Sequence, residues 1–139
     1  MKYRLREITT LPFTAMGRRR LWMAARALVW PVTFPLASAY RRTALRRVRV
    51  IAVAGSFGKT TATRAVAAVF GHVPSRLDWG LNSRGYLAEE LLRASPSSEV
   101  LVLEVGIKQP GQMQQYAKLL RPNIAIVMSI GTEHHTPLG

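Results

Sequence analysis

Residues 48–61 read VRVIAVAGSFGKTT. The first half is apolar and rich in valine, as in a buried strand of a parallel sheet. The second half, with two glycines, a lysine and two hydroxyls, is typical of a phosphate-binding loop that opens a helix. In such a loop the backbone N–H groups face one anion at the positive end of the helix. The order of strand, glycine turn, lysine and helix therefore predicts a nucleotide triphosphate as the ligand.

Each polar residue of this loop has a part in the predicted chemistry. Lys59 would reach the terminal phosphates, and Thr60 would offer its hydroxyl to Mg²⁺. The loop is tighter than the common P-loop, because Val53 stands where that pattern has its first glycine. The alternative is a glycine turn between a strand and a helix, with an incidental lysine. The predicted nucleotide-binding residues of the loop are Gly55, Ser56, Phe57, Gly58, Lys59, Thr60 and Thr61.

Beyond the loop, helix-like and strand-like patterns alternate. Apolar residues at helical spacing predict helices over residues 62–70, 85–94 and 111–120. The apolar positions of the last helix are Met113, Tyr116, Ala117 and Leu120. A continuous apolar run predicts a buried strand over residues 100–105, and residues 124–128 form the next strand. This alternation predicts an α/β fold, a P-loop-containing, doubly wound parallel sheet.

In such a sheet, ligands gather at the carboxyl ends of the strands. Residues 55–60, 104–106 and 129–135 should therefore meet at one edge. Glu104 ends a buried strand and needs a partner, since an unpaired carboxylate in a core is very costly. Mg²⁺ held between Glu104, Thr60 and the phosphates would be such a partner. The alternative is a salt bridge from Glu104 to a nearby lysine, Lys59 or Lys108.

Two adjacent histidines, His134 and His135, follow the last predicted strand. Neighbouring side chains on an extended chain point to opposite sides, so at most one of the two would be a ligand. The alternative for either is an ordinary surface histidine.

The charge of the chain is unevenly distributed. Its formal net charge is +13, of which residues 1–50 contribute +11 and residues 51–139 only +2. This difference argues against a uniformly basic domain that coats nucleic acid. The chain has no cysteine, which excludes disulfides, thiolate metal sites and a cysteine nucleophile.

Residues 21–40 are mostly apolar and carry one charge, at Arg26, with arginines on both sides. Twenty residues would just span a bilayer, but Arg26, Pro31 and Pro35 argue against a spanning helix. The aromatic and arginine content suits an anionic membrane surface, and the alternative is a helix docked on the following domain. Nucleic acid is the least favoured partner. We divide the chain into an arginine-rich, apolar helical segment, residues 1–47, and a nucleotide-binding domain, residues 48–139.

From residue 48 onward the chain resembles the Mur ligase family, the ATP-dependent amide-forming enzymes of cell-wall precursor synthesis. The motifs that carry the resemblance are Gly55–Thr61, Leu103–Gly106, Gln109–Gly111, Arg121–Val127 and Ile130–His134. The resemblance implies that a substrate carboxylate attacks the γ-phosphate of ATP to form an acyl phosphate. An incoming amine then displaces phosphate, while cations and the loop lysine neutralise the developing charge.

The resemblance also assigns residue roles. It implies that Lys59 binds the phosphates, that Thr60 and Glu104 hold one Mg²⁺, and that His134 helps to hold a second cation. Lys59 and His134 are the implied catalytic residues, and Asn82 would lie near the nucleotide phosphates. The implied cofactors are ATP and Mg²⁺, and the implied partners are a carboxylate donor and an amino-acid or dipeptide acceptor. We expect a cytoplasmic location, with residues 1–47 as the candidate contact with the inner face of the membrane.

The chain also departs from the family pattern. Ser129 stands where the family usually has an asparagine, and 47 arginine-rich residues stand in place of a uridine-nucleotide domain. The carbamoylated lysine and C-terminal domain of the family would lie beyond Gly139. We therefore expect a fragment with an open, apolar sheet edge that cannot complete the ligase reaction alone. The alternatives are a poly-glutamate-type ligase of the same family, a nucleotide-dependent switch, and a binding module that acts through its basic N-terminus.

Overall fold

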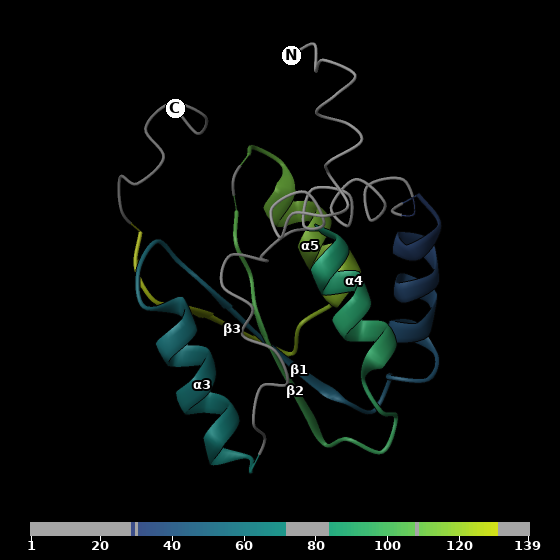
Figure 1. The fold of residues 1–139 in the computed structure, drawn as a ribbon, viewed down its shortest axis with the longest axis horizontal. Helices are drawn as coiled ribbons and strands as arrows, with labels where there is room; N and C mark the ends of the chain where they lie inside the picture. The colour runs from purple at the N-terminus through teal and green to yellow at the C-terminus, as the bar shows by residue number, and fades with distance from the viewer. Residues whose placement is uncertain (1–28, 30, 72–83, 108, 131–139) are drawn as a thin grey trace, which may run out of the picture.

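The computed structural model describes residues 29, 31–71, 84–107 and 109–130 of the chain. Within them, three strands form one parallel sheet, with helices on both of its faces (Figure 1). The strands are β1 (Arg49–Ala54), β2 (Val100–Glu104) and β3 (Ile124–Val127). The labelled helices are α3 (Lys59–Val69), α4 (Arg84–Arg93) and α5 (Gln112–Leu120). A further helix over residues 31–42 precedes β1 and is called the N-terminal helix below.

The central strand of the described sheet is β1, in the order β2-β1-β3. Both pairings are parallel, and Ile51 aligns with Val102 on one side and Ile124 on the other. Every residue of β1 after Arg49 is buried. Because the three strands are parallel, their carboxyl ends lie at one edge of the sheet. The prediction of an α/β fold with a parallel sheet is therefore confirmed for these three strands.

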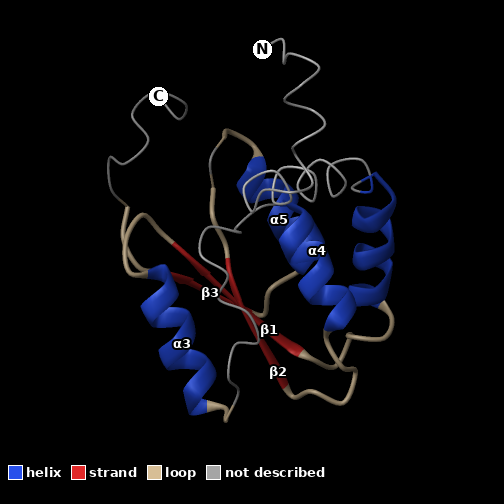
Figure 2. Ribbon diagram, viewed as in Figure 1, coloured by secondary structure: helices blue, strands red, loops and turns tan. Residues whose placement is uncertain are grey.

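Successive side chains of β1 point to opposite faces of the sheet. Val50, Ala52 and Ala54 belong to the main core, whereas Ile51 and Val53 are buried outside that cluster, on the side of α3. Figure 2 shows α3 on one side of the sheet and α4 and α5 on the other. The main core also contains Ala37, Leu45, Val48, Leu87, Ala88, Leu91, Leu103, Val105, Tyr116, Leu119 and Leu120.

The predicted helices form close to their predicted bounds, but α5 faces the core differently. Its buried residues are Gln112, Tyr116, Leu119 and Leu120. Of the four apolar positions with helical spacing, Tyr116 and Leu120 are buried, whereas Met113, 48% exposed, and Ala117 are exposed. Both sets of positions have helical spacing, so the periodicity alone could not choose between them. Packing of Leu119 in the main core fixes the rotation of the helix.

The described sheet has an apolar edge at β3. This strand pairs with β1 alone among the described strands, and Ile124 and Val127 are 50% and 58% exposed. Met128 and Ile130, which follow β3, are exposed as well. The described sheet therefore ends in an apolar strand that the described residues leave exposed.

The N-terminal helix packs against the domain. Ala37 on this helix, and Leu45 and Val48 after it, are fully or almost fully buried in the main core. The Tyr40 hydroxyl donates a hydrogen bond to the carbonyl of Ala94, after α4, at 3.1 Å. One side of this helix therefore packs on the domain, and the membrane contact expected for residues 1–47 stays a prediction. Across the described part of the chain, no helix is both long and apolar enough to cross a membrane.

One buried arginine ties the N-terminal helix to the end of α5. The Arg41 guanidinium donates to the carbonyls of Leu120 at 2.8 Å, Leu45 at 2.5 Å and Arg121 at 3.0 Å. It also donates to Oδ1 of Asn123 at 3.2 Å, and the same oxygen accepts the backbone N–H of Val50 at 2.9 Å. Burial lowers the pKa of Arg41, and the nearby positive charge of Arg121 lowers it further. The carbonyls at the end of α5, which have no partner within the helix, thus find a donor in Arg41.

Candidate nucleotide-binding site

The loop predicted to bind phosphate connects the carboxyl end of β1 to the first turn of α3. Gly55 has φ of 137° and Gly58, the N-cap of α3, has φ of 76°. Residues other than glycine rarely adopt such positive φ angles. The first helical hydrogen bond runs from the N–H of Ala62 to the carbonyl of Gly58, at 2.9 Å. The N–H groups of the first turn, residues 59–61, therefore have no acceptor within the helix.

Gly55 is required for a second reason, the close approach of the segment after β3. A Cβ atom at Gly55 would lie 2.9 Å from the nitrogen and 3.0 Å from the oxygen of Ser129, both backbone atoms. Backbone atoms cannot move aside as the end of a flexible side chain can. Only glycine therefore fits at this position.

Ser129 holds the loop in place through three hydrogen bonds, one of which its hydroxyl donates to the carbonyl of Phe57 at 3.4 Å. Its carbonyl accepts the N–H of Ser56 at 2.9 Å, and its hydroxyl oxygen accepts the N–H of Phe57 at 2.9 Å. The position of Ser129 just past a strand predicted that it lies at this edge of the sheet, near the loop. Its hydrogen bonds to the loop were not predicted. The N–H groups of Ser56 and Phe57 are therefore already bonded to Ser129. The N–H groups of residues 59–61, in the first turn of α3, are left as donors for an anion.

Lys59 lies over the loop that precedes it. Its ammonium donates to the carbonyl of Ser56 at 2.8 Å, and its side chain is partly buried. The Lys59 carbonyl accepts the hydroxyl of Thr63, one turn along α3, at 2.8 Å. The charge of Lys59 is thus held at the positive end of a helix, where an anion is favoured.

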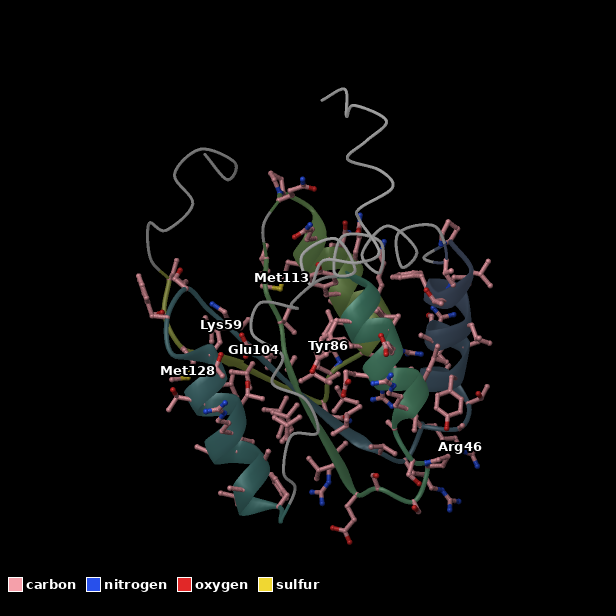
Figure 3. All side chains as sticks on the ribbon, viewed as in Figure 1. Arg46, Lys59, Tyr86, Glu104, Met113 and Met128 are labelled. Carbon is pink, nitrogen blue, oxygen red and sulfur yellow. The ribbon has the colours of Figure 1, made fainter. Side chains whose placement is uncertain are left out.

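Thr60 and Glu104 bring two oxygen-bearing side chains together across the site. The Thr60 hydroxyl donates to Oε2 of Glu104 at 2.8 Å, joining the first turn of α3 to the end of β2. Figure 3 shows Lys59 and Glu104 near each other at this edge of the sheet. A carboxylate and a hydroxyl are the oxygen ligands that Mg²⁺ accepts beside substrate phosphates and water. The donor set therefore fits Mg²⁺.

Among the described residues, no three His, Cys, Asp or Glu side chains are grouped so that they could hold a metal ion. A Mg²⁺ ion at Thr60 and Glu104 would take nucleotide phosphates and water as its other ligands.

The structure brings together only part of the predicted residue set. Residues 55–60, Glu104 and Ser129 lie at one edge, as the parallel topology required. Thr61 is exposed in the first turn of α3. Asn82 and His134 lie outside the described residues, so their assigned roles stay predictions.

The part of the sequence that holds these residues matches a known protein family. Residues 53–137, which include the loop, Glu104 and Ser129, match the Mur ligase middle domain. The chain belongs to this family. The resemblance to the Mur ligases carried by the loop and strand-end motifs is thereby confirmed.

Several curated relatives have the same name, UDP-N-acetylmuramoyl-tripeptide–D-alanyl-D-alanine ligase. The protein from Synechocystis is 32% identical over 96 residues, which are 66% of this chain and 21% of the relative. The Bacillus subtilis protein is 32% identical over 93 residues, 66% of this chain and 20% of the relative. The Escherichia coli protein is 31% identical over 88 residues, which are 62% of this chain and 20% of the relative. The Mur ligase chain thus matches about a fifth of the length of these relatives, and no solved structure matches it.

Proposed function

We propose that this Mur ligase chain supplies the ATP-binding part of a cytoplasmic acid–amine ligase in peptidoglycan precursor synthesis. The observation that carries the proposal is the pairing of Thr60 with Glu104 beside Lys59, at the positive end of α3. This arrangement suits a triphosphate with a bound divalent cation. Family membership and the names of the relatives support the ligase reaction.

In the proposed reaction, a substrate carboxylate attacks the γ-phosphorus of ATP, and ADP leaves. An amine then attacks the carbonyl carbon of the acyl phosphate, and inorganic phosphate leaves as the amide forms. Lys59 neutralises charge on the phosphates, and the N–H groups of residues 59–61 orient them. Thr60 and Glu104 would hold Mg²⁺, which draws electron density from the γ-phosphate when it is bound. By analogy with the relatives, the donor is a muramoyl peptide and the acceptor a D-alanyl dipeptide.

The ATP-binding step can be measured on this chain directly. Titration calorimetry with Mg²⁺-ATP should give saturable binding, and Lys59→Ala should weaken it at least tenfold, because the ammonium is lost from the phosphates. Lys118→Ala is the matched control, since Lys118 is an exposed lysine on α5, on the other face of the sheet. Its affinity should equal that of the parent.

Two further variants test the cation site. Thr60→Val and Glu104→Gln should each reduce the gain in ATP affinity that Mg²⁺ gives, while leaving ATP affinity in EDTA nearly unchanged. A folded parent chain that binds no ATP, or a Lys59→Ala variant that binds it normally, would contradict the proposal. The ligase step is then tested in the whole protein that contains this chain, as phosphate release that requires both donor and acceptor.

A further inference from the structure

The N-terminal helix has two faces of different character. Ala37 and Arg41 are buried against the domain, whereas Val32 and Leu36, on the opposite side, are 67% and 55% exposed. Val29, three residues before Val32, is also exposed. Residues spaced by three, four and seven positions share one side of a helix. Val32 and Leu36, one turn apart, therefore lie on one side of the helix that points away from the domain. They and the exposed, helical Val29 are called the outer stripe below.

A group of exposed arginines continues from the end of this helix. Arg42 lies in its last turn, Arg46 and Arg47 in the turn that follows, and Arg49 at the first position of β1. All four side chains are exposed, in contrast to the buried Arg41. Figure 3 shows Arg46 at the foot of the helix, on the outside of the molecule. These four residues are called the basic cluster below.

We propose that the outer stripe and the basic cluster together bind an anionic lipid surface. Aliphatic side chains on one side of a helix can enter the boundary between headgroups and acyl chains, and adjacent arginines attract anionic headgroups. Neither feature alone gives stable binding, but the two are contiguous on this chain. A nucleic acid backbone would use the arginines and gain little from the stripe, since phosphate contacts dominate its affinity. The aliphatic stripe therefore favours lipid over nucleic acid.

The placement of this surface leaves the candidate ATP site accessible. The basic cluster ends at Arg49, the amino end of β1, while the phosphate-binding loop begins after Ala54, at the carboxyl end. In Figure 3, Arg46 and Lys59 lie on opposite sides of the molecule. The same chain can thus lie on a membrane and present its nucleotide loop to the solvent. This inference does not depend on the proposed ligase function, because it uses none of the residues of the loop.

The test is sedimentation of the whole chain with vesicles. We expect binding to vesicles of 30% phosphatidylglycerol in phosphatidylcholine, weaker binding to phosphatidylcholine alone, and loss of binding as salt is raised. The double variant Arg46→Gln/Arg47→Gln should lower the partition coefficient by about fivefold for each arginine removed. The double variant Val32→Asn/Leu36→Asn should lower it at least tenfold, by removing apolar insertion.

The matched control is Arg64→Gln/Val69→Asn, which removes an exposed arginine and an exposed valine from α3, on the other face of the sheet. This control should bind vesicles like the parent. The absence of binding to anionic vesicles would overturn the proposal, and so would binding that survives both test variants.

Two other outcomes would identify a different occupant of this surface. Duplex DNA binding that Arg46→Gln/Arg47→Gln abolishes and Val32→Asn/Leu36→Asn leaves intact, without binding to vesicles, would assign the cluster to nucleic acid. A lower midpoint of thermal unfolding in Val32→Asn/Leu36→Asn, with unchanged vesicle binding, would show that the stripe is covered by the chain itself. Either result would overturn the lipid assignment.

Discussion

At the scale of single residues, the candidate site depends on how closely two backbone segments approach each other. Gly55 allows the loop to pass against Ser129, whose carbonyl and hydroxyl then hold the N–H groups of Ser56 and Phe57. The loop shape is thus determined partly by a residue 72 positions away from Phe57. A change at Gly55 should therefore act on the folded loop and on nucleotide binding together.

We predict that Gly55→Ala lowers the free energy of unfolding by at least about 2 kcal/mol, since it adds both backbone strain and a contact with Ser129. The measurement is urea denaturation, followed by titration with Mg²⁺-ATP, which should also be weakened. Gly71→Ala is the matched control. Gly71 also has positive φ, at 68°, but no atom of the described residues lies within 4 Å of its added Cβ, so the cost should be only about 1 kcal/mol from strain. Equal losses in the two variants would refute the role given to the contact with Ser129.

Ser129→Ala tests the same contact from the other segment. It removes the hydroxyl, which accepts the N–H of Phe57 and donates a longer hydrogen bond to the Phe57 carbonyl. It keeps the carbonyl that accepts the N–H of Ser56. We expect a loss of about 1 kcal/mol in stability, typical of one neutral hydrogen bond, and a several-fold loss in ATP affinity because the loop is less well ordered. Ser129→Thr keeps the hydroxyl and should restore most of the affinity. No difference between these two variants would show that the hydroxyl has no part in positioning the loop.

At the scale of secondary-structure elements, the N-terminal helix is joined to the sheet by one charged side chain. Arg41 donates to carbonyls of Leu45, Leu120 and Arg121, and so connects this helix with the end of α5. Asn123, just before β3, accepts from both Arg41 and the backbone of β1. The helix and the sheet should therefore lose stability together when this arginine is removed.

We predict that Arg41→Met destabilises the chain by about 2–4 kcal/mol, because buried carbonyls are left without donors. Chemical denaturation followed by circular dichroism measures this loss. Arg42→Met, at the exposed neighbouring position, should change the stability by no more than about 0.5 kcal/mol. A loss in Arg41→Met as small as that of the control would show that the guanidinium contacts do not hold the helix in place.

At the scale of the whole molecule, the described sheet ends in an exposed strand with an apolar surface. Ile124 and Val127 on β3, and Met128 and Ile130 after it, are all exposed. An exposed apolar strand at a sheet edge is a template for pairing with another chain. Self-association is therefore expected to begin at β3.

Val127→Lys should reduce this self-association, since a charge at an edge strand disfavours pairing between chains. Light scattering of the purified chain over a range of concentrations gives the measurement. Val69→Lys is the control, because Val69 is an exposed valine on α3 and away from the strand edge. The same reduction in both variants would mean that added charge, rather than the edge, controls association.

The sequence by itself determined the order of strand, loop and helix, the parallel α/β class and the membership in the Mur ligase family. These follow from short-range patterns: an apolar run, two glycines with a lysine between strand and helix, and helical spacing. Only the tertiary structure decided which face of α5 is buried, how Ser129 holds the loop and how Arg41 joins the N-terminal helix to α5. The physical reason is that these contacts join residues about 70–80 positions apart. They depend on which strands are neighbours in the sheet, and local periodicity does not contain that information.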